Sequence, residues 1–263
     1  MRLELLTREP ETDARPTPIL FIHGAWHGAW CWEENFLPYF SAHGYISHSM
    51  SLRGHGSSEG HKRLFWTRIE DYVNDVVQVV EGMEKPPILV GHSMGGHVVQ
   101  KYLETYMAPA AVLLAPVPKK GIIGFVMRVA RKHPGLFLKF LVTLKPYHAV
   151  STPELTREMF FSPDVAEDKV AECYARLQNE SYRAVLDMLF LNLPDPKRVK
   201  KTPLLVLGAA NDNIFSIKEE EDTAFAYGLR AEVFSDMAHD MMLEEGWQDV
   251  ADRILDWLHG LDL

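Results

Sequence analysis

The stretch Pro86–Glu104, PPILVGHSMGGHVVQKYLE, changes character abruptly in its middle. An apolar run typical of a buried strand reaches a turn with three glycines and one serine, and a helical pattern follows at once. Gly91, Ser93 and Gly95 fit the pattern G-x-S-x-G, in which small residues let the chain pass close to a serine on a sharp strand-to-helix turn. Such a turn exposes the hydroxyl, and the following helix directs backbone N–H groups toward a reacting oxygen. The stretch therefore predicts that Ser93 is a nucleophile rather than part of a plain glycine-rich turn.

Strand and helix patterns alternate along most of the chain. Short, continuously apolar runs are followed by longer amphipathic ones, which favours an α/β fold with a mostly parallel sheet covered by helices on both faces. We predict strands over residues 18–24, 44–52, 86–93, 110–116, 202–210 and 230–236, and helices over residues 68–83, 94–106, 218–227 and 247–258.

The interval Val117–Pro196 breaks this alternation, because it has helical patterns but no convincing strand. We predict a helical insertion here, called the cap below. It divides the rest of the chain into two parts of one α/β core, residues 1–116 and 197–263.

The first part of the cap has an unusual charge pattern. No Asp or Glu occurs between Glu104 and Glu154, whereas seven cations do: Lys119, Lys120, Arg128, Arg131, Lys132, Lys139 and Lys145. Helix-breaking residues at 133–135 predict two short amphipathic helices on either side. Their apolar face either packs on the core alone or lines an acyl pocket while the cations contact an anionic headgroup or lipid surface.

Composition limits the classes of function. The 263-residue chain is 47% apolar and carries a formal net charge of −9, which argues against nucleic acid as a partner because phosphate binding requires an excess of clustered cations. Cys31 and Cys173 are the only cysteines, so we expect no disulfide framework. The sequence has no HExxH motif and no Cys/His cluster, and we expect no metal and no cofactor. The sequence starts without the apolar core of a signal peptide, and we expect a soluble, cytoplasmic protein.

A nucleophilic serine requires a general base and an acid that orients this base. His239 follows the last predicted strand and precedes the last helix, where a loop reaches the carboxyl edge of the sheet. Asp212 directly follows the strand over residues 202–210, and the competing loop after residues 110–116 offers no carboxylate. We therefore predict Asp212 as the orienting acid, and we interpret Asp236 and Asp240 as solvated or capping groups.

An oxyanion hole requires two backbone N–H groups, one of them from the residue after the nucleophile. Met94 supplies this first group. The turn in FIHGAW offers Ala25 as the second donor, with Trp26 as the neighbouring alternative. We predict that Trp26 and His92 line the substrate site, and that His27 has a structural or substrate-lining role.

The ordered motifs FIHGAW, SLRGHGSS, LVGHSMGG, LGAANDNIFS and MAHDMMLE resemble the α/β-hydrolase superfamily of serine hydrolases, in its esterase and lysophospholipase-like branch. Ser93, Asp212 and His239 reproduce the chain order of that family. The resemblance implies a helical cap inserted after the sixth strand. It also implies a Ser-His-Asp triad that cleaves a carboxylic ester through an acyl-enzyme intermediate.

The same motifs leave several activities open. Thioesterases, lactonases, carbon-carbon bond hydrolases and cofactor-free haloperoxidases share them, and some members of the fold are ligand-binding receptors. The partner that we expect is a small-molecule ester, with a medium or long acyl chain if the cap lines an acyl pocket.

Overall fold

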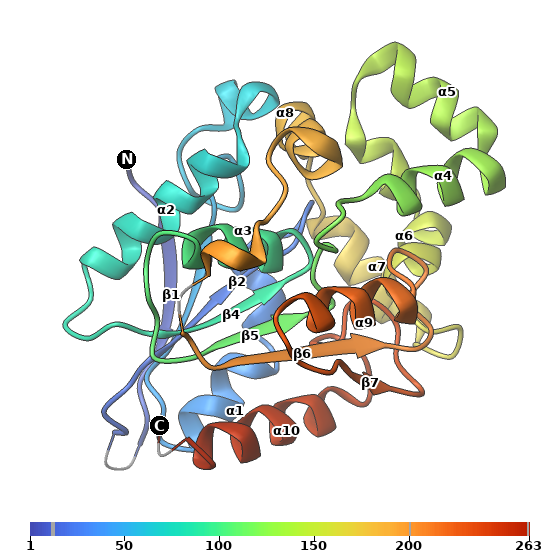
Figure 1. The fold of residues 1–263 in the computed structure, drawn as a ribbon. Coiled ribbons are helices and arrows are strands. Elements are labelled where there is room, and N and C mark those ends of the chain that lie inside the picture. Colours follow the sequence, from blue (N-terminus) through green and yellow to red (C-terminus); the bar gives the residue numbers. More distant parts are fainter. Residues whose placement is uncertain (12–13, 200, 262) are drawn as a thin grey trace.

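The computed structural model describes residues 1–11, 14–199, 201–261 and 263. Seven strands form one sheet in the order β1-β3-β2-β4-β5-β6-β7 (Figure 1). The strands are β1 Glu4–Arg8, β2 Ile19–Ile22, β3 Ser47–Ser51, β4 Ile88–His92, β5 Ala111–Leu114, β6 Leu204–Ala209 and β7 Glu232–Phe234. Only β1 is antiparallel to its neighbour, so the predicted α/β fold with a mostly parallel sheet is confirmed.

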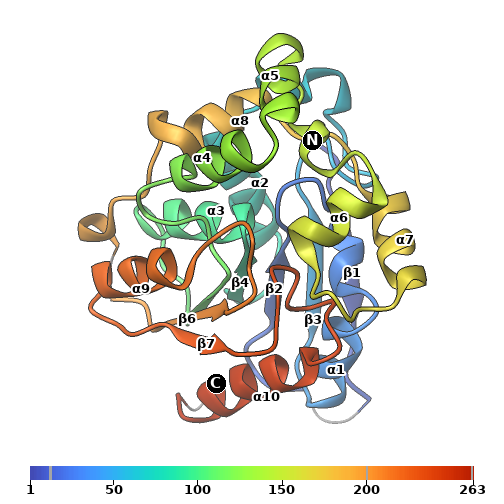
Figure 2. The same ribbon diagram turned by 90° about the vertical axis from the view of Figure 1, so that its right-hand side faces the viewer.

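Every residue of strands β2, β4 and β5 is buried, as their continuous apolar runs predict. Helices on the two faces bury these strands: α2, α3 and α9 lie on one side of the sheet, and α1 and α10 on the other (Figures 1 and 2). Their bounds are α1 Phe36–Ala42, α2 Ile69–Glu81, α3 Met94–Leu103, α9 Ile217–Ala226 and α10 Trp247–His259.

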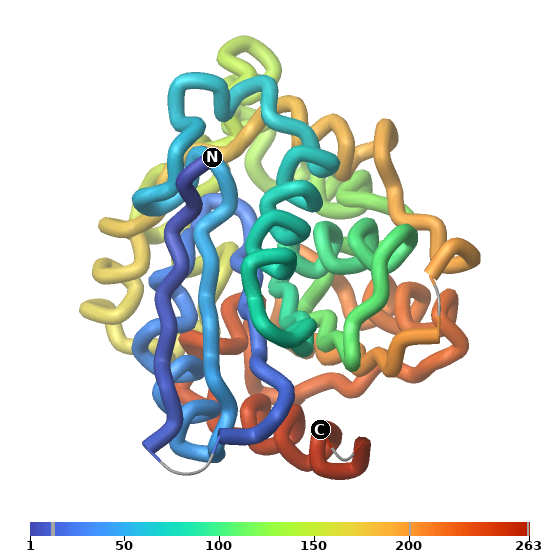
Figure 3. Tube along the Cα trace, turned by 90° about the vertical axis from the view of Figure 1, so that its left-hand side faces the viewer, coloured from blue at the N-terminus to red at the C-terminus, as the bar shows by residue number. Residues whose placement is uncertain are grey.

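The sequence analysis did not predict strand β1 or helix α1. β1 runs along the outer edge of the sheet beside β3 (Figure 3), and its residues are half-buried or exposed. Its sequence ELLTR therefore has no continuous apolar run that would identify a buried strand.

Between β5 and β6 the described chain forms helices and no strand. The α-helices are α4 Ile123–Lys132, α5 Pro134–Thr143, α6 Pro153–Phe160, α7 Glu167–Arg176 and α8 Tyr182–Leu186. Shorter helical turns are Pro146–Val150, Asp187–Leu191 and Pro196–Arg198 here, and Ala29–Trp32 and His61–Trp66 in the core. The cap follows the fifth strand of this sheet and not the sixth, because β1 is the only strand that precedes β2.

Helices α4 and α5 meet at His133, close to the predicted break. Pro134 starts α5 rather than separating the helices, since proline suits the first helical position. Helices α4–α7 lie beyond the ends of the central strands (Figure 1), so the cap covers the carboxyl edge of the sheet. Within the part of the chain that the structure describes, no helix is both long and apolar enough to cross a membrane.

Candidate active site

Ser93 lies on the turn between β4 and α3 in a left-handed conformation, with φ 51° and ψ −115°. This strained turn depends on the small residues around it. A Cβ atom on Gly91 would lie 2.5 Å from the carbonyl oxygen of Gly95, and one on Gly95 would overlap the carbonyl oxygen of Ile22. The glycines of the motif therefore allow β4, α3 and the end of β2 to approach closely enough to hold Ser93 in place.

His239 and Asp212 form a hydrogen-bonded pair beside this turn. The Nδ1–H of His239 donates to Oδ2 of Asp212 over 2.6 Å, and both side chains are buried. The other carboxylate oxygen, Oδ1, accepts the backbone N–H groups of Ile214 at 2.6 Å and Phe215 at 3.0 Å. These bonds fix the carboxylate and place the proton on Nδ1, so Nε2 of His239 is left as a lone-pair acceptor.

A largely apolar cavity lies above Ser93 and encloses about 830 Å³, including its open mouth. The core contributes Ala25, Trp26, Ser93 and Met94 to its wall. The cap contributes most of the remaining wall, including Phe125, Val126 and Val129 of α4 and Leu136, Phe137 and Phe140 of α5. Both predicted oxyanion donors therefore lie in the same cavity wall as the serine.

The loop that carries Ala25 packs directly against the serine turn. A Cβ atom on Gly24 would lie 2.8 Å from Nδ1 of His92 and 3.0 Å from Cβ of Ser93. Only glycine thus lets this loop approach the nucleophile. Trp26, two residues after Gly24, takes a left-handed φ of 67°, and its side chain forms part of the cavity wall.

His92 does not line this cavity, contrary to the prediction from sequence. Its ring is buried behind the serine, where its Nε2–H donates to the carbonyl oxygen of His239 over 3.0 Å. Burial, together with the nearby His239 ring, lowers the pKa of His92 to about 3. The neutral ring therefore links the residue before Ser93 to the backbone of the loop that carries His239.

A second histidine–aspartate pair lies close to the first. Asp240 is fully buried, which corrects its interpretation as a solvated or capping group, and its Oδ2 lies 3.0 Å from Nε2 of His27. Burial opposes charge on both groups. The Asp240 carboxylate nevertheless raises the pKa of His27, and His27 lowers the pKa of Asp240. The two residues form a buried ion pair.

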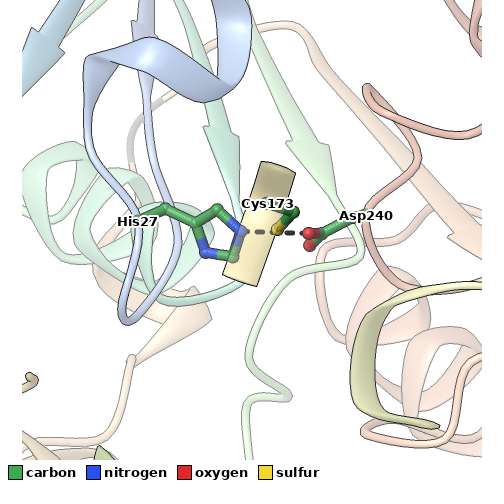
Figure 4. Close-up of side chains that lie close together, drawn as sticks. All are labelled: His27, Cys173 and Asp240. Atoms are coloured by element: carbon green, nitrogen blue, oxygen red, sulfur yellow. Dashed lines mark hydrogen bonds and ion pairs between the residues drawn. The ribbon is translucent and has the colours of Figure 1, made fainter. Parts of the chain in front are cut away.

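Cys173 of α7 packs against this ion pair (Figure 4). One side-chain atom of each of His27, Cys173 and Asp240 lies within 4.8 Å of the others, and these residue types bind metals in many proteins. Burial raises the pKa of the Cys173 thiol well above its ordinary value, and the hydrogen bond between His27 and Asp240 already uses their facing atoms. The arrangement fits a hydrogen bond between His27 and Asp240 rather than a metal bound by the three residues. The absence of a metal stays a prediction.

Residues 19–253 match the model of the family described as "Alpha/beta hydrolase family". The chain belongs to the alpha/beta hydrolase family. The matched region includes the serine turn, the inserted cap and both histidine–aspartate pairs.

Two relatives of this alpha/beta hydrolase have named activities. It is 28% identical to pFDCC methylesterase MES16 of Arabidopsis thaliana, over 77% of this chain and 79% of the relative. It is 26% identical to monoacylglycerol lipase of Mycolicibacterium smegmatis, over 95% and 90% of the two chains. The crystal structure of bromoperoxidase from Bacillus anthracis shares the fold, with a TM-score of 0.74 and 18% identity over 98% and 95% of the chains.

Sequence reasoning missed two polar side chains in the cavity wall of this alpha/beta hydrolase, His148 and Glu180. Glu180 of the cap is fully buried, and its carboxylate accepts hydrogen bonds from His55 at 3.1 Å and from the Tyr72 hydroxyl at 2.7 Å. Burial alone would raise the pKa of Glu180, but His55 and the other hydrogen-bond donors lower it. No motif identifies Glu180, because its partners lie more than 100 residues earlier in the chain.

Proposed function

We propose that this alpha/beta hydrolase cleaves a carboxylic ester with Ser93 as nucleophile, His239 as general base and then acid, and Asp212 as the acid that orients His239. The observation that carries the proposal is the common cavity of Ser93, Ala25 and Met94, together with the hydrogen-bonded pair of His239 and Asp212. The ring of His239 lies 5.4 Å, between ring centroids, from that of Phe215 in the cavity wall. The two relatives named for ester cleavage support the same substrate class.

The proposed mechanism gives each of these groups one role. The Ser93 hydroxyl attacks the ester carbonyl while Nε2 of His239 takes its proton. The N–H groups of Ala25 and Met94 stabilise the oxyanion that forms. His239 then gives the proton to the leaving alcohol, and a water molecule, deprotonated by the same nitrogen, releases the carboxylic acid and regenerates the serine.

Replacement of the serine tests this mechanism most directly. Ser93→Ala should lower kcat for an aryl ester on the order of 10⁶-fold, because the covalent route is lost. Ser235→Ala, which changes an exposed serine near His239, is the matched control and should keep wild-type turnover. A fluorophosphonate should label Ser93 alone, as mapped by mass spectrometry. Near wild-type hydrolysis by Ser93→Ala, or labelling of another serine, would contradict the mechanism.

The apolar cavity wall supports an ester with a medium or long acyl chain. Each buried methylene contributes about 0.8 kcal/mol, so kcat/KM should rise from acetate to octanoate by at least about tenfold. Val126→Phe should narrow the cavity and lower kcat/KM for octanoate but not for acetate. The neighbouring Met127→Phe, on the exposed face of α4, is its control. A preference for acetate would contradict the acyl pocket.

The same residues could instead cleave a thioester, a lactone or a carbon-carbon bond, or support halide-dependent peroxidation. The last alternative is kept because a bromoperoxidase shares the fold. Turnover of matched oxygen esters, thioesters and lactones, with a halide and peroxide assay alongside, separates them. A receptor of the same fold would bind an ester without turning it over.

A further inference from the structure

Three loops around the proposed active site meet at one buried carboxylate, that of Asp240. Its Oδ2 lies 3.0 Å from Nε2 of His27, on the loop that carries Ala25. Its Oδ1 lies 3.7 Å from Nε2 of His92, the residue before the serine. Asp240 itself follows His239 directly, and its backbone N–H donates to the carbonyl oxygen of Phe160 in the cap over 3.0 Å.

His27 carries protons on both ring nitrogens in this arrangement. Its Nδ1 lies 2.8 Å from the carbonyl oxygen of Ala25, and its Nε2 faces the Asp240 carboxylate. Neither partner can donate a proton, so both nitrogens must be donors. His23, on the same loop, differs: its Nδ1–H donates to the Gly24 carbonyl, but its Nε2 accepts the backbone N–H of Leu52. Both hydrogen bonds of His23 are therefore made by a neutral ring. Both hydrogen bonds of His27 need a protonated ring, whose charge the Asp240 carboxylate balances.

The bond from His27 holds the residue that carries the proposed oxyanion donor. Ala25 lies in the cavity wall, and its carbonyl oxygen accepts the Nδ1–H of His27. The next carbonyl, that of Trp26, accepts the backbone N–H of Gln178 in the cap over 2.9 Å. Among the described residues, His27 is the only side chain that hydrogen-bonds to Ala25. A shift of this ring would therefore move the peptide group that joins Ala25 to Trp26, and with it the Cα atom next to the Ala25 N–H.

We propose that His27 and Asp240 form a second, non-catalytic histidine–aspartate pair that positions the Ala25 N–H of the oxyanion hole relative to His239. The inference rests on the proposed function, since it assumes that Ala25 stabilises an oxyanion on the substrate of Ser93. Both residues are positioning residues, because neither touches the cavity. Cys173 and the rings of Trp30 and Phe160 enclose the pair and keep water from it.

Two substitutions at one position separate the hydrogen bond from the charge. In Asp240→Asn the side-chain amide can donate to Nε2 of a neutral His27, whose Nδ1–H still holds Ala25, so kcat should stay within about fivefold of wild type. In Asp240→Ala this hydrogen bond is lost without leaving a buried charge. Its kcat should fall on the order of 10²-fold with KM little changed, as expected for a displaced oxyanion donor.

The affinity for a boronic acid inhibitor tests the oxyanion hole separately from the overall stability of the protein. The tetrahedral adduct of the inhibitor uses the oxyanion hole, so this affinity should fall in parallel with kcat/KM in Asp240→Ala, while the affinity for the carboxylic acid product should not change. Asp236→Asn, an exposed acid on the same loop, is the control. If Asp240→Ala does not fold, His27→Gln gives the same test, because glutamine can keep the bond to Asp240 but withdraws the donor from Ala25.

Several results would overturn the inference while leaving the proposed function intact. Asp240→Ala or His27→Gln with normal kcat, in protein whose Ser93 is labelled normally by fluorophosphonate, would show that the pair does not position the oxyanion hole. A nitrogen-15 NMR spectrum of the wild-type protein near pH 7 should show two ring protons on His27, and a single one would contradict the ion pair. One equivalent of zinc in the purified protein that is lost in Cys173→Ser would replace it with a metal site. Loss of labelling at Ser93 in the wild-type protein would instead contradict the proposed function.

Discussion

Helix α3 and helices α4 and α5 contribute to the wall of the same cavity but are held in very different ways. Nine of the ten residues of α3 are buried, whereas none of the ten residues in either α4 or α5 is. Ser93 and Met94 thus lie at the start of a helix fixed throughout its length by the core. The cap side of the cavity depends on two helices that each cover the cavity with one face and expose the other. The proposed nucleophile and the proposed acyl pocket are therefore supported by regions of different stability.

Helix α4 is held by partly buried apolar side chains and by ion pairs. Arg128 lies 2.9 Å from Glu219 of α9, and Lys132 lies 3.0 Å from Glu158 of α6. Such partly exposed pairs stabilise a fold by only about 0–1 kcal/mol each. Burial of apolar side chains contributes more, at about 1.5–3 kcal/mol for each large one. Displacing α4 should therefore cost far less free energy than displacing α3.

After the loss of Ser93 itself, the largest effect is expected for a second change in the rigid part. Asp212→Asn should lower kcat on the order of 10⁴-fold, because an amide no longer fixes the proton on Nδ1 of His239. KM should change little, since the cavity wall of the cap is untouched. Steady-state kinetics on an aryl ester measures both constants.

Asp236→Asn is the control for this substitution, because Asp236 is exposed and lies three residues before His239. Equal losses in the two variants would contradict the assignment of the acid. They would also weaken the contrast between a fixed catalytic geometry and an adaptable cap.

The same contrast explains how much the sequence predicts. Strands β2, β4 and β5 and the turn at Ser93 are identified by local patterns, because burial on both faces of a strand and a strained turn each restrict residue types. Asp212 and His239 follow from their positions after strands. Their roles stay predictions, but the structure brings the two side chains within 2.6 Å of each other.

Long-range polar contacts are what the sequence does not reveal. His27 and Asp240 are 213 residues apart, and each looks like an ordinary loop residue until the fold brings them together. Glu180 lies in the cap, where the helical pattern says nothing about which side chain faces the core. Edge strand β1 is missed for the related reason that its pairing with β3, and not its own composition, makes it a strand.

Hydrogen exchange should sharpen the comparison between the helices directly. Backbone amides of α4 and α5 should exchange on the order of 10²-fold faster than those of α3, because few buried contacts oppose their local opening. Helix α6, in the cap but with Thr156, Met159 and Phe160 buried, should be intermediate. Mass-spectrometric exchange of the free protein gives these rates. Equal protection of α3 and α4 would show that burial is not what distinguishes the two regions.

The smallest effect concerns the exposed face of the same two helices. Leu138 and Val142 are 62% and 76% exposed. Arg131, Lys139 and Lys145 lie nearby in the sequence and have no ion-pair partner among the described residues. An apolar face edged by cations favours an anionic lipid surface, to which each lysine near the surface contributes about 1 kcal/mol.

The combined change Lys139→Glu and Lys145→Glu should therefore weaken sedimentation with phosphatidylserine-containing vesicles by at least about tenfold at low salt. Added salt should weaken binding of the wild-type protein in the same way, since it screens these charges. Lys85→Glu with Lys197→Glu changes the same total charge on exposed residues outside α4 and α5, and it should leave vesicle binding nearly unchanged. Turnover of a short, water-soluble ester should not change in either variant, because neither pair of residues lines the cavity.

If both variants lose vesicle binding equally, net charge and not the exposed face of α4 and α5 governs the contact. If the wild-type protein does not bind at low salt, that face contacts only solvent and the lipid-surface prediction is wrong, while the catalytic assignments are unaffected.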